Sequence, residues 1–421
     1  MSGQRVAGRA VLVGYAKRSA ELPMCESSLD ELARLLDTAG GEPFARVIQI
    51  KPSIDPATVI GSGKVEEIRA LCEANEIELA VFDMELSPSQ IRNLEEGLGD
   101  VLVLDRSMLI LDIFALHATS GEGKLQIELA QLRYTAPRLT GRGKELSRLG
   151  GTIGTRGPGE SKLEEDRRHI RHRISALEEQ LFEMEKNRET MRAARARSGI
   201  PKVAIVGYTN AGKSTLLNLL TDAGVLSQDK LFATLDPTTR RLTLPEGEEI
   251  LLTDTVGFIR KLPHHLIKAF HSTLEEAALA DILLIVVDYS DPEKEEQLAV
   301  TYETLRTLGA EGKPALIVYN KCDALEENID LDALEREDTV FFSAKTGMGR
   351  EGLFEKLLKL VRNGKKKCLL HIPYDKSGEV NGIYRVGTVE NIEYLSDAIA
   401  VTAVLDAKGI GMYRAYLQKE E

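Results

Sequence analysis

Hydrophobic and polar positions alternate with two different periods along the first 115 residues. Short β-branched runs predict three parallel strands, at 46–50, 79–83 and 101–105. Amphipathic stretches with a helical period lie around them, at 27–39, 64–75 and 88–97. Ser87 before Pro88 is typical of a helix start, with a capping hydroxyl and a proline in the first turn. This alternation predicts a small N-terminal α/β domain over residues 1–115.

A helical hairpin is predicted over residues 116–199. A long charged stretch, from about Lys162 to Arg197, places apolar residues at a 4-3-4-3 spacing: Ile170, Ile174, Leu177, Leu181 and Met184. Such a narrow apolar seam suits one antiparallel partner helix. The helical stretch 126–134, which Pro137 should end, is the natural partner. Because this partner lies in the same chain, we expect a monomer rather than a dimeric coiled coil.

The segment that joins the two hairpin helices, residues 138–162, is rich in glycine and in positive charge. Six basic residues stand against two acidic ones, namely Arg138, Arg142, Lys144, Arg148, Arg156 and Lys162 against Glu145 and Glu160. We therefore expect a flexible basic loop at the tip of the hairpin. By composition alone, an ordinary surface linker fits as well as an RNA-binding projection.

Strand–helix alternation returns over residues 200–363. Five buried β-branched runs predict strands at 203–206, 250–253, 282–288, 315–319 and 340–342. They fit a doubly wound sheet covered by helices on both faces. Residues 365–367 read as a lysine-rich linker. Residues 368–421 then predict a small C-terminal α+β domain in the order strand, helix, strand, strand, helix.

A phosphate-binding loop is predicted directly after the strand 203–206. The sequence GYTNAGKS fits G-x-x-x-x-G-K-[ST] and opens a leucine-rich helix, which is the context this motif requires. Its glycines let backbone N–H groups point at phosphate oxygens near a helix N-terminus. Lys213 would add a positive charge at the β- and γ-phosphates, and Ser214 a hydroxyl for Mg²⁺. The predicted phosphate site comprises Gly207, Tyr208, Thr209, Asn210, Ala211, Gly212, Lys213, Ser214 and Thr215.

The base is predicted to be guanine. The motif N-K-C-D follows the strand 315–319 and resembles the guanine-recognition motif of regulatory GTPases. The Asp323 carboxylate can accept hydrogen bonds from N1–H and the exocyclic amine of guanine, and adenine offers neither donor there. Asn320 would bridge the base and the phosphate loop, and the Lys321 stem would cover the ring. The loop after the next strand resembles the one whose backbone N–H meets guanine O6, and it comprises Ser343, Ala344 and Lys345.

Two further segments resemble the switch regions of GTPases. Asp254 to Gly257 fits D-x-x-G, with Asp254 reaching Mg²⁺ through water and the Gly257 N–H reaching the γ-phosphate. A threonine of FATLDPTTR should complete the Mg²⁺ site, and we prefer Thr234 to its rivals Thr238 and Thr239. Lys213, Thr234 and Gly257 form the predicted catalytic set; Ser214, Thr234 and Asp254 form the predicted metal set. The remaining predicted nucleotide contacts are Phe232, Ala233, Leu235, Thr255 and Val256.

The residue after D-x-x-G departs from the common pattern. Many GTPases place a glutamine there to orient the attacking water, and this chain has Phe258. A phenylalanine cannot form a hydrogen bond with water. We therefore expect slow intrinsic hydrolysis that a partner stimulates.

Taken together, these motifs resemble the HflX GTPases of the translation-factor-related Obg–HflX group. The resemblance rests on GYTNAGKS, FATLDPTTR, DTVGFIRKLP and NKCD, with support from the segments 61–67 and 150–160. It implies an α/β multidomain protein: a P-loop GTPase doubly wound sheet, preceded by a small α/β domain with a helical hairpin and followed by a small α+β domain. It also implies a cytoplasmic GTPase that uses Mg²⁺, binds the large ribosomal subunit, and splits or rescues ribosomes under stress.

The resemblance also implies finer features. The basic loop 138–162 would contact ribosomal RNA through its phosphates. Related GTPases with an asparagine at the position of Asn210 can use K⁺ beside the phosphates, so K⁺ is a second candidate cofactor. Some family members also hydrolyse ATP through regions outside the GTPase domain, so ATP is a second candidate nucleotide.

Composition and charge limit the functions and locations that fit this chain. Lys and Arg number 54 and Asp and Glu 66, giving a net charge of −12, so any RNA contact needs a local basic patch. No run approaches the roughly 18–20 apolar residues of a membrane span. Four widely spaced cysteines favour a reducing cytoplasm. An RNA-modifying or RNA-maturing GTPase and a non-ribosomal GTP sensor stay open, although the final residues YLQKEE lack the cysteine motif of tRNA-modifying relatives.

Overall fold

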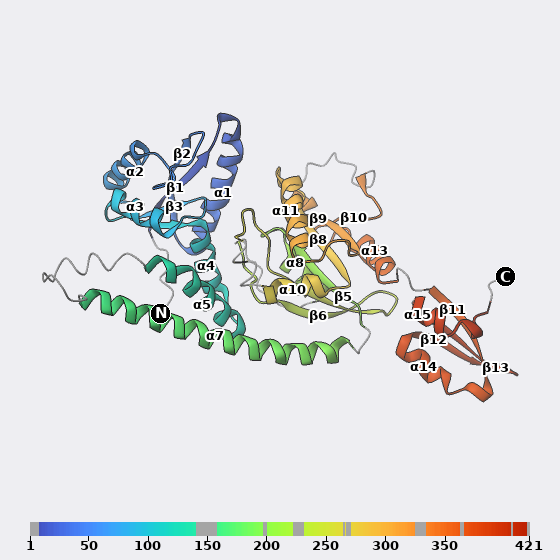
Figure 1. Cartoon of the computed structure of the whole chain (residues 1–421). Coiled ribbons are helices and arrows are strands. Elements are labelled where there is room, and N and C mark those ends of the chain that lie inside the picture. Colours follow the sequence, from blue (N-terminus) through green and yellow to red (C-terminus); the bar gives the residue numbers. More distant parts are fainter. Residues whose placement is uncertain are drawn as a thin grey trace.

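The computed structural model describes residues 8–139, 158–196, 200–221, 231–263, 266, 271–324, 334–362, 366–405 and 407–418. Within these residues the strands form a four-stranded, a six-stranded and a three-stranded sheet. Figure 1 shows the three sheets following one another along the chain, with one long helix running past the first two. The predicted multidomain α/β fold class is confirmed. The domain bounds given above stay a prediction.

The first sheet is parallel, with the order β2-β1-β3-β4. Its strands are β1 Arg9–Ala16, β2 Glu42–Ile50, β3 Leu79–Phe82 and β4 Leu102–Asp105. Its helices are α1 Leu22–Ala39, α2 Ser62–Asn75 and α3 Pro88–Leu98. The predicted capping of α3 is present, because the Ser87 side chain accepts a hydrogen bond from the Gln90 N–H. The pattern did not predict the central strand β1, although its residues are almost all buried.

Three helices follow. The first, α4 Arg106–His117, is one that the pattern also missed. The other two, α5 Gly121–Thr135 and α7 Pro158–Ala196, are the antiparallel pair. The Arg173 guanidinium of α7 donates to both Glu128 carboxylate oxygens of α5, over 2.7 and 2.8 Å. Leu177 is fully buried, and the other residues of the predicted seam are half-buried. The predicted pairing of these two helices is therefore correct. Most of the predicted basic loop, 140–157, lies outside the described residues.

The six-stranded sheet has the order β10-β9-β8-β5-β7-β6 and is parallel except for β6. Its strands are β5 Lys202–Gly207, β6 Thr238–Thr243, β7 Glu249–Asp254, β8 Ile282–Asp288, β9 Ala315–Asn320 and β10 Thr339–Phe341. Its helices are α8 Lys213–Thr221, α10 His271–Leu279, α11 Lys294–Thr307 and α13 Arg350–Arg362. All five predicted strands are present. The pattern missed β6, an antiparallel edge strand with the mostly polar sequence TTRRLT.

One hydrophobic core joins the N-terminal region to the six-stranded sheet. It contains Leu32 of α1 and Phe114 of α4, together with Phe232, Phe258 and Ile285 of the nucleotide-binding part. On the opposite face of the sheet, α8 and α13 pack through a separate core. Helices α10 and α11 cover the first of these two faces, and the helices of the N-terminal region pack beside them against the switch residues Phe232 and Phe258.

The C-terminal sheet is antiparallel, with the order β11-β13-β12. Its elements are β11 Lys366–Pro373, α14 Glu379–Val386, β12 Gly387–Tyr394, β13 Ala398–Leu405 and α15 Ala407–Met412. The predicted order of strands and helices is correct. The linker predicted at 365–367 is wrong at its last two residues, because Lys366 and Lys367 pair with β13. Short 3₁₀ turns lie at Ser19–Glu21, Ala136–Leu139, Cys322–Ala324, Tyr374–Lys376 and Arg414–Tyr416.

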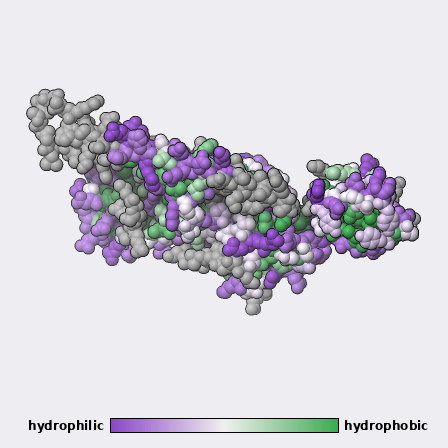
Figure 2. Space-filling view, turned by 90° about the horizontal axis from the view of Figure 1, so that it is seen from below, coloured by the Kyte–Doolittle hydropathy of each residue, from purple (hydrophilic) through white to green (hydrophobic). Residues whose placement is uncertain are grey.

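The surface view in Figure 2 is mostly hydrophilic, with hydrophobic residues in small patches. Among the described residues, no helix has the length and apolar character that crossing a membrane requires. Scattered exposed apolar residues of this kind are normal on a protein surface.

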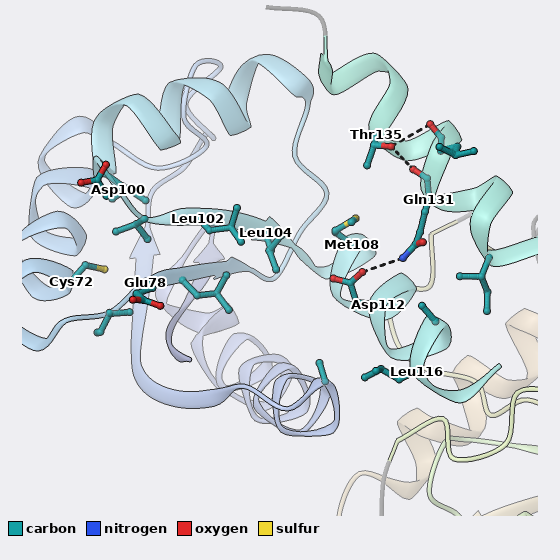
Figure 3. Close-up of a pocket in the computed structure, with 18 of the residues that line it drawn as sticks. Cys72, Glu78, Asp100, Leu102, Leu104, Met108, Asp112, Leu116, Gln131 and Thr135 are labelled. Carbon is teal, nitrogen blue, oxygen red and sulfur yellow. Dashed lines mark hydrogen bonds between the residues drawn. The ribbon is translucent and has the colours of Figure 1, made fainter. Parts of the chain in front are cut away.

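A groove of about 1690 Å³ lies where β3 and β4 begin, between the N-terminal sheet and helices α4 and α5. Figure 3 shows Asp112 of α4 and Gln131 of α5 on its wall, joined by a hydrogen bond of 3.2 Å. Burial raises the pKa of Asp112 to about 6, although the Gln131 amide opposes this shift. Asp112 is half-buried, and its hydrogen-bond donor in the described part of the chain is the neutral Gln131 amide.

Candidate functional site

The predicted phosphate loop lies where β5 ends and α8 begins. Gly207 and Gly212 both have positive φ, at 145° and 94°. A Cβ atom at Gly207 would lie 2.2 Å from the Val286 carbonyl oxygen, and one at Gly212 would lie 2.2 Å from the Asn320 Nδ2. Only glycine fits these positions. Asn210 also has a positive φ of 61°, so the loop curls tightly between the strand and the helix N-terminus.

Lys213 begins helix α8 with its side chain buried in the loop. Its Nζ donates to the Tyr208 carbonyl oxygen over 2.7 Å. Burial lowers the pKa of Lys213 to about 8, although the nearby Asp254 carboxylate opposes this shift. Phosphate oxygens placed here would strongly favour the charged ammonium group.

Three oxygen-bearing side chains converge beside the phosphate loop. The Ser214 Oγ lies 2.7 Å from the Thr234 Oγ1 and donates to the Asp254 Oδ2 over 2.7 Å. Thr239 lies instead in β6, 2.9 Å from the Thr253 hydroxyl. The structure therefore brings together Ser214, Thr234 and Asp254, the residues of the predicted metal set.

This cluster fits a hard divalent cation. Asp254 is fully buried, and its Oδ1 has no hydrogen-bond partner among the described residues. Burial raises the pKa of Asp254, while Lys213 and Ser214 oppose the shift. A buried carboxylate oxygen without a partner costs free energy, and a magnesium ion held by hydroxyl, carboxylate and water oxygens would satisfy it.

The D-x-x-G segment runs back along the phosphate loop. The Phe258 N–H donates to the Gly207 carbonyl over 3.0 Å, and the Thr209 N–H donates to the Phe258 carbonyl over 2.7 Å. A Cβ at Gly257 would lie 2.7 Å from the Thr209 Cα, so this close approach requires glycine. The Phe258 side chain is buried in the core shared with the N-terminal region, away from any position for water.

The predicted base-binding loops meet at the ends of β9 and β10. The Asn320 Nδ2 donates to the Ala211 carbonyl over 2.8 Å, and its Oδ1 accepts from the Ala344 N–H over 2.9 Å. Asn320 thus ties the phosphate loop to the loop after β10. The Ser343 hydroxyl donates to the Asp323 Oδ1 over 2.6 Å, which orients that carboxylate.

Not every predicted contact presents its side chain to this site. Thr255 is buried and donates to the Ile205 carbonyl over 2.7 Å, and Val256 and Leu235 are also buried. These residues can contribute only through their backbone. Lys345 is exposed, and Lys321 forms an ion pair with Asp288 over 2.6 Å. Sequence reasoning missed Asp288, although it ends a predicted strand at the edge where ligands bind.

Sequence reasoning also missed a buried charge network behind the phosphate loop. The Tyr208 hydroxyl donates to Glu31 of α1 and accepts from the Arg260 N–H over 2.9 Å. Arg106 of α4 donates to Glu31, to Asp83 over 2.7 Å, and to the Arg260 carbonyl over 3.1 Å. Burial acts to lower the pKa of Arg106, but its two carboxylate partners hold it above the usual value.

A doubly wound sheet with these loops at the carboxyl ends of its strands defines a P-loop GTPase. Three family profiles match the chain: "GTP-binding GTPase N-terminal" over residues 26–115, "GTP-binding GTPase Middle Region" over 117–195 and "50S ribosome-binding GTPase" over 202–321.

Individual proteins are similar over most of the chain. A protein called GTPase HflX from Lacrimispora saccharolytica is 50% identical over 400 residues, covering 95% of this chain and 94% of that protein. A second GTPase HflX, from Caldanaerobacter subterraneus subsp. tengcongensis, is 49% identical over 395 residues, covering 94% and 90%. A solved structure called "crystal structure of SsGBP and GDP complex" shares 29% identity and covers 84% of this chain and 98% of that one, with a TM-score of 0.47. The chain therefore belongs to the HflX GTPase family: it binds guanine nucleotides and hydrolyses GTP.

Proposed function

We propose that this GTPase acts on the large ribosomal subunit, in translation, ribosome splitting or rescue, or ribosome assembly under stress. The family profile matched over residues 202–321 carries this proposal, because its description is a 50S ribosome-binding GTPase. The basic loop supports it, since a negatively charged chain needs a local positive patch to bind RNA. In this proposal the protein works in the cytoplasm as a monomer.

The hairpin suits a contact at some distance from the nucleotide. Helix α7 has 39 residues, which corresponds to a length of about 58 Å. The segment that connects it to α5 carries the basic residues Arg142, Lys144, Arg148 and Arg156. GTP would order Thr234 and the segment 254–257, and hydrolysis would release them and change the placement of the hairpin.

Each residue of the site has an assigned role in this proposal. Lys213 neutralises charge on the β- and γ-phosphates, and the Gly257 N–H donates to the γ-phosphate. Ser214, Thr234 and Asp254 would hold Mg²⁺, Asp254 through water; a bound Mg²⁺ offsets the negative charge of the phosphate oxygens.

The remaining proposed roles concern the guanine base, the attacking water and a second cation. Asp323 accepts from the guanine N1–H and amine, and Asn320 holds the two flanking loops together. Because Phe258 is buried in the core, the chain offers no glutamine-like group there, and slow hydrolysis without a partner follows. Asn210 is the candidate K⁺ ligand.

The test is co-sedimentation with purified large ribosomal subunits, in a non-hydrolysable GTP analogue and in GDP. We expect more protein in the pellet with the analogue, and faster GTP turnover when subunits are added. Changing the four basic loop residues to alanine should abolish binding. The matched control changes four exposed basic residues elsewhere, Arg69, Arg306, Lys359 and Lys376, to alanine and should bind normally.

Two outcomes would count against the proposal. An absence of sedimentation and of stimulation in every nucleotide state would favour the GTP sensor. Equal losses in the loop variant and its charge-matched control would remove the loop from the mechanism, because they would reflect net charge alone.

A further inference from the structure

The switch segment 232–236 is attached to the N-terminal region on both sides of Thr234. Phe232 lies two residues before Thr234 and Asp236 two residues after it. Two residues of extended chain span at most about 7 Å. Displacing either attachment by a few ångströms would therefore move the Thr234 hydroxyl out of hydrogen-bonding range of Ser214.

The first attachment is made by Phe232. Its ring packs edge-on against Phe114 of α4, with centroids 4.7 Å apart and an interplanar angle of 72°. Both rings are almost completely buried. The Phe232 N–H donates to the Thr209 Oγ1 of the phosphate loop over 2.9 Å. Phe232 has a positive φ of 56°, which a bulky residue adopts only where its surroundings hold it.

The second attachment is made by Asp236 at the N-terminus of α5. Its Oδ2 accepts from the Thr119 N–H over 3.0 Å, the Thr119 hydroxyl over 2.7 Å and the Ser120 N–H over 2.7 Å. Its Oδ1 accepts from the Ser120 hydroxyl, which itself accepts from the Gly123 N–H over 2.9 Å. Ser120 therefore caps α5 and holds the switch segment with one side chain.

The Asp236 carboxylate fits the N-terminus of α5 in both charge and shape. A carboxylate is favoured near the positive end of a helix. Burial acts against ionisation of Asp236, but the Ser120 and Thr119 donors hold its pKa below the usual value. A Cβ at Gly123 would lie 2.7 Å from the Asp236 Oδ1, so the close approach depends on a glycine.

We propose that the corner between α4 and α5, through Phe114 and Ser120, positions Thr234 for the γ-phosphate and its metal ion. Phe114, Ser120 and Asp236 are thus positioning residues that act through Thr234. They increase the affinity for GTP and leave the affinity for GDP unchanged, because a switch threonine contributes to binding only when a γ-phosphate is present. The inference rests on the role proposed above for Thr234.

The coupling acts in both directions. If the placement of the corner favours GTP, then GTP must favour that placement of the corner by the same factor. Helix α5 is joined to α7 by the Glu128–Arg173 pair, so the same contact ties the nucleotide state to the hairpin.

The test measures the affinities of purified full-length variants for a non-hydrolysable GTP analogue and for GDP, across a range of Mg²⁺ concentrations. Asp236→Asn replaces one carboxylate oxygen, which accepts hydrogen bonds, with an NH₂ group that would face the Thr119 and Ser120 donors. We expect an affinity for the analogue about tenfold weaker, a higher Mg²⁺ requirement, and a GDP affinity within about twofold of the wild type. Ser120→Ala should act in the same direction, and Ser120→Thr, which keeps the hydroxyl, should restore the affinity.

Ser87→Ala is the matched control, because it removes the cap of α3 in the same region without touching the switch segment. It should leave the ratio of the two affinities unchanged. Equal losses for both nucleotides in Asp236→Asn and Ser120→Ala would show a merely structural role and overturn the inference, as would wild-type affinities in both.

Thr234→Ala separates the two proposals. If it loses affinity for the analogue while Asp236→Asn does not, the positioning inference fails and the role of Thr234 stands. If Thr234→Ala binds the analogue as the wild type does, the role of Thr234 fails and the inference fails with it.

Discussion

Replacing Arg106 by methionine should destabilise the contact between the N-terminal region and the GTPase sheet. The Arg106 side chain is 2% exposed and pairs with Glu31 and Asp83, which are 7% and 2% exposed. Methionine keeps much of the length but removes the charge and every donor. Removing one partner of a buried ion pair costs about 3–5 kcal/mol, because the other charge is left without compensation.

The structure indicates which carboxylate bears most of this cost. Asp83 keeps two other donors, the Ser28 hydroxyl over 2.6 Å and the Lys261 ammonium. Glu31 keeps only the Tyr208 hydroxyl among the hydrogen-bond donors described for it. We therefore place the loss near the lower end of the range, at about 3 kcal/mol, and assign it mainly to Glu31.

The assay is equilibrium urea unfolding of the single variant Arg106→Met, the single variant Glu31→Met and the double variant. The double variant leaves no buried charge without its partner at this position, so it should recover most of the stability lost in either single variant. A loss below about 1 kcal/mol in Arg106→Met, or losses that simply add in the double variant, would refute the reasoning.

Three further predictions follow from single contacts. Asp112→Asn should raise the free energy of unfolding by about 3 kcal/mol at pH 8 and leave it unchanged below pH 4. The reason is that the raised pKa of Asp112 makes the wild type lose stability as the pH rises from about 4 to about 6. Urea unfolding of both proteins across this pH range measures the difference, and parallel pH dependences would contradict the prediction. Gly212→Ala should abolish nucleotide binding in calorimetry, since its Cβ would meet Asn320 at 2.2 Å; normal affinity would disprove the loop geometry. GTP turnover should be faster in K⁺ than in Na⁺ buffer if Asn210 binds K⁺, and equal rates would eliminate that role.

The site could be predicted largely because its parts are local. The phosphate loop, D-x-x-G and N-K-C-D each lie within a few residues at the end of a buried strand. A parallel sheet brings such strand ends to one edge whatever the strand order. The convergence of Ser214 and Asp254 follows from this rule. Thr234 lies instead in the segment before the antiparallel strand β6, and the structure places it, rather than Thr239, beside Ser214.

The remaining features depend on contacts between distant parts of the chain. Tyr208 and Glu31 are 177 positions apart, and Ser120 and Asp236 are 116 apart. No local pattern indicates that α1 and α4 face the phosphate loop. The strand β1 was missed for a different reason: Gly14 interrupts its apolar run, and a glycine inside a run weakens the pattern of a strand; here a Cβ would lie 2.7 Å from the Cys25 Sγ of α1.

Selection of guanine by Asp323 is the central claim, and calorimetric titration of the purified chain with GDP and ADP tests it most directly. We expect GDP to bind and ADP to bind at least about a thousandfold more weakly, because adenine leaves the carboxylate without its two donors. Asp323→Ala should reduce this preference sharply. Binding of ADP as tight as that of GDP, or no uptake of GDP at all, would contradict the account.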